Sequence, residues 1–100
     1  MASIALENSL SQGHSYTWPQ TLPESGLSSK TKVNGKKVVL KDSTKYASHA
    51  KGSSVHTSEM RLVDGGSSKA KIEGYPISRK GDSLKDGDTI DEGFDKVNVG

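Results

Sequence analysis

The sequence contains no cysteine, which excludes disulfide bonds and zinc sites built on thiolates. Aromatic residues make up only 5% of the chain and hydrophobic residues 30%, so the hydrophobic core of this 100-residue chain must be small. Small domains with little core depend on disulfides, on a structural metal or on a partner subunit. With disulfides excluded, we expect a metal ion or a partner to stabilise the fold.

Long apolar runs are also missing. The run at residues 38–40 is far shorter than the roughly 20 residues that a membrane-spanning helix needs. The N-terminus lacks the basic start and the apolar core of a secretory signal, so we expect no Sec-type export. Apolar residues do not recur with a 3.6-residue period over more than a few positions, which predicts little or no helix.

The charge of the chain is nearly balanced, with 14 basic and 12 acidic residues interspersed along it. Only residues 30–41 show a local excess of lysine, and no aromatic residues that could stack on bases accompany it. Lysines that alternate along a hairpin are typical of a solvated face. We therefore predict no nucleic-acid partner.

One segment occurs twice in the chain. Residues 32–43 have a diverged second copy at residues 71–83, and each copy alternates polar and apolar residues, turns at a pair ending in Gly and closes with Asp-Ser. The first turn, Asn34-Gly35, is a strong hairpin signal because both central residues of a type I′ turn need positive φ. The corresponding pair of the second copy, Glu73-Gly74, is a weaker signal for the same turn. The repeat predicts two β-hairpins.

The two ends of the chain each supply half of this unit. Residues 4–9 match the second half of the unit, and residues 96–98 match its first half. The two ends are therefore expected to pair and complete a third hairpin. We predict one all-β domain over residues 1–100, a small cone of hairpins in a pseudo-three-fold arrangement whose apex is held by a metal.

The three histidines lie in irregular stretches that follow the strands. These stretches are residues 9–29 with His14 and the single Trp18, residues 44–58 with His49 and His56, and residues 84–93 with Asp86 and Asp88. A short strand is expected between them at residues 60–63. If the three units surround one axis, the three stretches meet at one end of the molecule.

Three imidazoles and one carboxylate form a suitable tetrahedral donor set for zinc. We predict that His14, His49, His56 and Asp86 are the ligands, with Trp18 either capping a small core or serving the site. A site ligated entirely by the protein is structural, and its metal contributes folding energy directly. No nucleophile or general base recurs near the histidines, so we predict that the chain is not an enzyme.

Several motifs of the chain, taken together, resemble those of the PAAR-repeat proteins, which sharpen the spike tip of contractile phage tails and type VI secretion systems. The resemblance rests on residues 33–39, on residues 72–82, on Gly13-His14 followed by Trp18-Pro19, and on the stretch with His49 and His56. The second copy keeps a Pro-x-x-Arg skeleton followed by Gly-Asp, and the first copy has lost its Pro and Arg. Asp86 stands where members of the family usually carry a cysteine.

The resemblance implies a cone of β-hairpins with a metal near its apex, usually zinc, with iron as the other choice. The cone would be a membrane-piercing tip that docks on a trimeric β-helical spike, one monomeric tip per trimer, and touches the target envelope only transiently. It would be made in the bacterial cytoplasm and reside in the virion, and the chain looks like a bare tip without extension domains. The strand residues proposed for docking are Val33, Val38, Ile72 and Ile77.

Two questions stay open at the level of sequence. Because the family's cysteine is replaced, the fourth ligand is Asp86, Asp88, water or none. The alternative function is that of a small metal-independent β-rich module that binds carbohydrate or protein.

Overall fold

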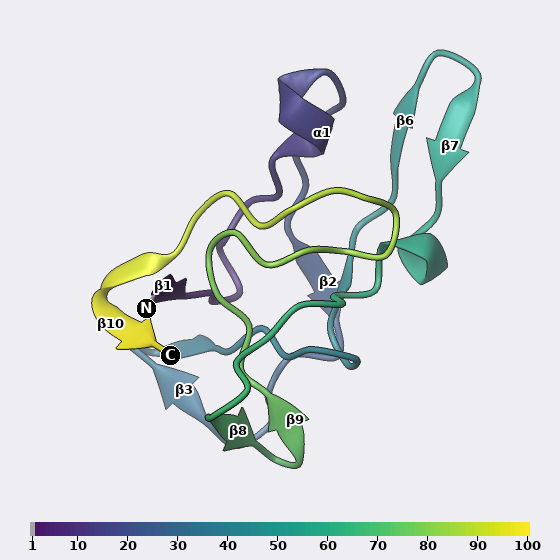
Figure 1. The fold of residues 1–100 in the computed structure, drawn as a ribbon. Coiled ribbons are helices and arrows are strands. Elements are labelled where there is room, and N and C mark those ends of the chain that lie inside the picture. The colour runs from purple at the N-terminus through teal and green to yellow at the C-terminus, as the bar shows by residue number, and fades with distance from the viewer. Residues whose placement is uncertain (1) are drawn as a thin grey trace.

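Short antiparallel strands, paired two by two, make up most of the regular structure (Figure 1). The structure is a computed structural model that describes residues 2–100. The strands are β1 (Ala2–Ile4), β2 (Pro23–Ser25), β3 (Lys32–Val33), β4 (Lys36–Lys37), β5 (Lys45–Tyr46), β6 (His49–Lys51), β7 (Ser54–His56), β8 (Lys71–Ile72), β9 (Tyr75–Pro76) and β10 (Phe94–Val99). The helices are the four-residue α1 (Gly13–Tyr16) and the 3-10 helix η1 (Ser58–Arg61). The prediction of an all-β domain with little helix is confirmed.

Both hairpins expected from the repeat are present. Strand β3 pairs with β4, and β8 pairs with β9. The turn residues adopt the positive φ of a type I′ turn, 52° and 76° at Asn34 and Gly35 and 55° and 87° at Glu73 and Gly74. The repeated turn chemistry therefore predicted the local structure correctly.

The two ends of the chain pair as the half-units predict. Strand β1 runs antiparallel to β10, with Ala2 opposite Val99 and Ser3 opposite Asn98. The N and C labels accordingly lie next to each other in Figure 1. The chain thus closes on itself through a pairing of distant segments.

Three repeat-related residues form a ring of backbone hydrogen bonds at the centre. The N–H of Ala5 donates to the carbonyl of Ser78, Ser78 donates to Val39, and Val39 donates to Ala5, each over 3.0 Å. All three residues are fully buried. Because each donates to the next in the same rotational sense, the ring supplies the pseudo-three-fold arrangement within one chain.

The core consists of two small clusters. The hairpin cluster is formed by Ile4, Leu6, Val38, Leu40, Ile77 and Val99, and the loop cluster by Ala5, Val39, Tyr46, Val63, Leu84 and Ile90. Neighbouring residues of one strand divide between the clusters because strand side chains alternate in direction. Partly buried hydrophobic residues pack against the hairpin cluster. They are Val33 from β3, Ala70 just before β8, Ile72 from β8, and Phe94 and Val97 from β10.

The two ends of the molecule differ in their elements. Hairpins β3–β4 and β8–β9 lie at one end, called the hairpin end, and α1 and hairpin β6–β7 project at the other, called the histidine end (Figure 1). The molecule measures 38 × 24 × 22 Å along its principal axes. None of the helices within residues 2–100 combines the length and the hydrophobicity needed to cross a membrane.

Three sequence-based predictions of local structure are wrong. Residues 9–29 are not irregular throughout, because they contain α1 and β2. Residues 44–58 are not irregular, because they contain β5 and the hairpin β6–β7. Residues 60–63 do not form a strand, because Met60 and Arg61 end the 3-10 helix η1 and only Leu62 and Val63 make isolated bridges. None of these stretches has the apolar alternation that marks a longer strand, so periodicity was uninformative there.

The four residues predicted for docking lie in two different settings. Val38 and Ile77 are buried members of the hairpin cluster, so their side chains support the hairpins from inside. Val33 and Ile72 are half-buried on β3 and β8 and pack against the same cluster. Only this second pair offers side-chain surface at the hairpin end.

Candidate metal centre

His14 is held in an unusual backbone turn. Four successive residues, Gly13 to Tyr16, have positive φ values of 70°, 48°, 62° and 68°. Only glycine adopts this region freely, and each other residue costs about 1–2 kcal/mol there. The Trp18 N–H donates to the Gly13 carbonyl over 2.9 Å, and the Thr17 hydroxyl donates to the His14 carbonyl over 2.8 Å. Strain of this kind is typical of functional sites, and here it occurs at the residue whose imidazole faces His49 and His56.

His49 and His56 come from the two strands of one hairpin. They are directly opposite each other in the β6–β7 pair, so both side chains leave the same face of the ladder. His49 is buried, whereas the His56 side chain is 23% exposed. A single short hairpin therefore delivers two imidazoles to one point.

Asp86 reaches the same point from the loop at residues 84–93. That loop is tightened by hydrogen bonds from the Leu84 N–H to the Asp88 carbonyl and from the Gly87 N–H to the Leu84 carbonyl. The Asp86 side chain is 1% exposed, and its Oδ1 accepts the Asp88 N–H over 3.1 Å. Oδ2 faces the histidines and also accepts a hydrogen bond from Arg61.

The four side chains converge as the sequence predicts. The three imidazole nitrogens are separated by 3.2, 3.2 and 3.1 Å, and the Asp86 Oδ2 lies 3.4, 3.4 and 3.0 Å from His14, His49 and His56. These six distances are the edges of a nearly regular tetrahedron. Its centre lies about 2.0 Å from each vertex, which matches the distances from zinc to imidazole nitrogen and carboxylate oxygen. The donor atoms therefore fit a tetrahedral metal ion.

His49 has the protonation expected of a ligand. Its Nδ1 lies 3.0 Å from the Pro19 carbonyl, which assigns the N–H to Nδ1 and leaves the lone pair on Nε2, the atom that faces the site. Burial lowers the pKa of His49 below its ordinary value, the hydrogen bond to Pro19 opposes this, and the charge of Arg61 lowers it further. The imidazole is consequently neutral near pH 7.

Asp86 has the protonation expected of a ligand as well. Burial alone would raise its pKa, but the Asp88 N–H and the Arg61 guanidinium outweigh burial and hold the pKa of Asp86 below its usual range. The side chain is therefore an ionised carboxylate at neutral pH. Ionised oxygen and neutral nitrogen donors are what a divalent metal requires.

Both carboxylate oxygens of Asp88 accept hydrogen bonds from groups other than the imidazoles. Its Oδ1 accepts the N–H groups of His14 and Thr89 over 3.0 and 2.8 Å, and its Oδ2 accepts Arg61 over 3.2 Å. Asp88 thus ties the His14 turn to the Asp86 loop instead of facing the imidazoles. Of the carboxylates considered from the sequence, Asp86 is the one that joins the histidines.

Trp18 covers the three imidazoles. Its ring is stacked on His56 with centroids 4.3 Å apart, and its centroid lies 4.7 Å from that of His49 and 5.3 Å from that of His14. An aromatic cover restricts water around the donor atoms and limits the movement of the rings. Of the two roles considered for Trp18, the structure favours service to the site.

Arg61 is a part of the site that the sequence did not suggest. Its side chain is fully buried, and Nη1 donates to Asp86 Oδ2 over 2.7 Å and to Asp88 Oδ2 over 3.2 Å. Arginine is not a metal ligand, and the residue stood in a segment predicted to be a strand, so no motif pointed to it. One argument could have pointed to Arg61: if Asp86 and Asp88 are both buried, a nearby cation is needed to neutralise their charge.

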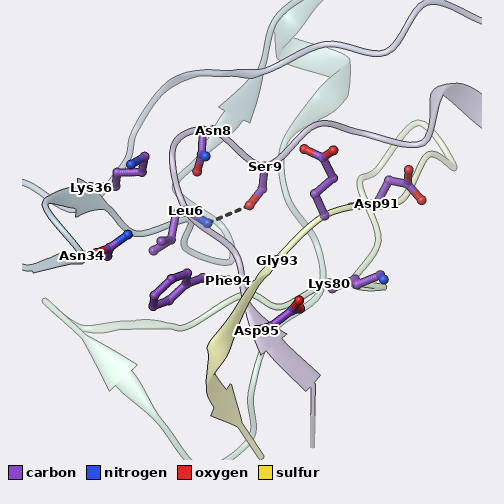
Figure 2. Close-up of a pocket in the computed structure, with 11 residues that line it drawn as sticks. Leu6, Asn8, Ser9, Asn34, Lys36, Lys80, Asp91, Gly93, Phe94 and Asp95 are labelled. Atoms are coloured by element: carbon purple, nitrogen blue, oxygen red, sulfur yellow. Dashed lines mark hydrogen bonds between the residues drawn. The ribbon is translucent and has the colours of Figure 1, made fainter.

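A polar groove of about 310 Å³ lies elsewhere, between the Leu6–Ser9 turn, the tip of hairpin β3–β4 and the start of β10 (Figure 2). Its charged side chains are Lys36, Lys80, Asp91, Glu92 and Asp95. The acidic groups already have partners within the chain, since Asp91 accepts Tyr16, Glu92 accepts the Leu10 N–H and Asp95 accepts Ser3. None of the metal-site residues lines this groove.

Comparison with known proteins assigns no family to the chain. No protein-family model matches it, and no curated protein matches it. The geometry of the histidine end and of the central ring is therefore the basis for a functional proposal.

Proposed function

We propose that this chain is the metal-stabilised, membrane-piercing tip of a trimeric β-helical spike, as its resemblance to PAAR-repeat proteins implies. The observation that carries the proposal is the ring formed by Ala5, Val39 and Ser78, which gives a single chain pseudo-three-fold order. A monomer with three similar faces docks on a three-fold trimer without a symmetry mismatch. The expected stoichiometry is one tip per trimer.

The hairpin end is the docking face in this proposal. Strand pairs β3–β4, β8–β9 and β1–β10 all pack around the hairpin cluster, and their free edges can extend the strands of a β-helix by β-augmentation. The half-buried Val33 and Ile72 lie on two of these pairs and supply apolar contact. The histidine end would then point away from the spike, toward the target envelope that it touches transiently.

The metal holds the histidine end together in this proposal. His14, His49, His56 and Asp86 would ligate zinc, with iron as the other choice, and the ion would supply a structural cross-link between three stretches that share only a small core. A cross-link of this kind gives a rigid point. Such a tip would be made in the bacterial cytoplasm and would reside in the virion at the tail baseplate, or in a related injection machine.

Docking is tested by mixing the purified chain with a trimeric β-helical spike protein encoded in the same genome and measuring the mass of the complex by light scattering. One chain per trimer is expected. Val33→Asp should weaken the complex, whereas Val55→Asp on the exposed strand β7 at the histidine end should not, with circular dichroism confirming that both variants fold. Absence of a complex, or three chains per trimer, contradicts the proposal.

A second candidate function is a metal-independent β-rich module that binds carbohydrate or protein. It is favoured by one observation, the ion pair of Arg61 with Asp86, which neutralises the carboxylate without a metal. Elemental analysis of protein purified without a His-tag separates the candidates. About one equivalent of transition metal supports the spike tip, and negligible metal supports the module.

A further inference from the structure

The guanidinium of Arg61 lies where all three loops of the histidine end meet. Its Nε donates to the Ala47 carbonyl over 2.8 Å, and its Nη2 donates to the hydroxyls of Thr21 and Ser11 over 2.8 and 3.2 Å. Its Nη1 donates to Asp86 and Asp88 in the third loop. One side chain therefore cross-links the stretches that carry His14, His49 with His56, and Asp86.

The hydrogen-bonding capacity of Arg61 is fully used. A guanidinium has five N–H donors, and the five oxygens just named can each take one. Nη1 also lies 2.8 Å from His49 Nε2, so its two N–H groups are shared among three acceptors, Asp86 Oδ2, Asp88 Oδ2 and His49 Nε2. Arg61 therefore contacts two of the four donor atoms of the metal centre, His49 Nε2 and Asp86 Oδ2.

Arg61 supplies a countercharge for the buried carboxylates of the cluster. Asp86 and Asp88 are two carboxylates whose side chains are at most 1% exposed, and Arg61 is the buried cation between them. Buried carboxylates without a countercharge would be strongly destabilising. Arg61 removes one of the two negative charges and leaves a single net negative charge for a divalent cation to meet.

We propose that Arg61 is the positioning residue of the metal centre, a built-in cation that assembles the three loops before any metal binds and sets the orientation of Asp86 for coordination. The second half of this inference, that Arg61 orients Asp86 for coordination, rests on the metal site of the proposed function. Arg61 acts through Asp86, because it engages the same oxygen, Oδ2, that faces the imidazoles. Residues that orient a ligand in this way typically change metal affinity 10–100-fold when replaced.

The test compares Arg61→Lys and Arg61→Met with Arg79→Met. Arg79 is the other arginine of the chain, and it forms a two-point ion pair with Asp82 at 3.0 Å. It is a matched control because its carboxylate partner is not one of the four metal-site residues. Each variant is titrated with Co²⁺ alone, and the visible absorption and the affinity are recorded together with the melting temperature in a chelator.

We expect wild type and Arg79→Met to give the intense visible bands of four-coordinate Co²⁺ with the same affinity. Arg61→Lys keeps the charge but not the fork of donors, so it should bind Co²⁺ at least about tenfold more weakly and with weaker bands. Arg61→Met should also melt well below wild type in the chelator. If Arg61→Met does not fold, Arg61→Lys decides the question.

The outcomes separate the inference from the proposed function. Equal Co²⁺ affinity, spectrum and metal-free melting temperature in wild type and Arg61→Lys would overturn the role of Arg61 while leaving the metal centre intact. Absence of Co²⁺ binding by wild type would overturn the metal site and the orienting role of Arg61 toward it, whereas the melting temperatures in chelator would still decide whether Arg61 assembles the three loops. Loss of affinity in Arg79→Met equal to that in Arg61→Lys would show that removing any arginine has this effect, and would overturn the inference alone.

Discussion

The indole of Trp18 lies almost parallel to the imidazole of His56, with ring centroids 4.3 Å apart and planes inclined by 12°. It also lies within 5.3 Å, centroid to centroid, of the other two histidine rings. Because the chain has a single tryptophan, its fluorescence reports the state of this one site.

Binding of Ni²⁺ to the metal-free protein should quench the fluorescence of Trp18, since a paramagnetic ion among the histidines would lie close to the indole. A chelator should restore the emission. The variant His56→Ala, titrated in parallel, should show weaker quenching. Unchanged emission in a sample that elemental analysis shows to contain nickel would contradict the placement of the ion.

Metal removal should lower the melting temperature without unfolding the chain at room temperature. Free metal at about 100 times its Kd stabilises a folded state by about 2.7 kcal/mol, which corresponds to about 10–20 °C for a domain of this size. Calorimetry with and without chelator measures the shift. The double variant His14→Ala, His49→Ala should melt at the same temperature in both buffers, and a chelator effect retained in that variant would argue against these ligands.

Gly26→Ala should destabilise the fold by about 3 kcal/mol or more. Gly26 has a φ of 73°, and an added Cβ would lie 1.9 Å from the Ser43 carbonyl oxygen, so strain and a steric clash combine. The matched control is Gly52→Ala at the tip of hairpin β6–β7, where φ is 61° and no atom lies within 4 Å. It should cost only about 1 kcal/mol. Urea unfolding compares the two, and equal effects would show that the close approach at Gly26 is relaxed in solution.

The Glu73 carboxylate should make stability depend on pH in the acidic range. Hydrogen bonds from the Ser29 and Lys30 N–H groups, together with the Ser29 hydroxyl, lower the pKa of Glu73 to about 2 from an ordinary value of 4.5. A depressed folded-state pKa means that the stabilisation is complete above about pH 4.5 and is lost as the pH falls toward 2. The melting temperatures of wild type and Glu73→Gln should therefore differ at pH 6 and converge near pH 2. A difference that stays constant over this range would contradict the role of the carboxylate.

The sequence predicted the parts of the fold that depend on local turn chemistry and on repetition. Asn34-Gly35 identified a hairpin because few residue pairs adopt two successive positive φ values, and the repeat carried that assignment to β8–β9. The half-units at residues 4–9 and 96–98 predicted the pairing of β1 with β10. The meeting of His14, His49, His56 and Asp86 followed from the same three-fold reasoning.

The remaining features depend on tertiary contacts that no sequence pattern encodes. The hairpin β6–β7 has three-residue strands whose inward positions are the histidines themselves, so no apolar alternation marks it. Only Gly13 indicates the left-handed turn at His14 in the sequence, because Ser15 and Tyr16 have no preference for positive φ. Arg61 could not be assigned because its five oxygen partners come from segments spread along the whole chain.

The pairing of β1 with β10 makes the polypeptide nearly circular. Consider a permuted chain in which Gly100 is linked to Ala2 and new ends are opened at Gly52-Ser53. Every strand would keep its pairing partner, because the new opening lies at the exposed tip of hairpin β6–β7. The order of the segments around the axis, and not the place where the chain is opened, is what specifies this architecture.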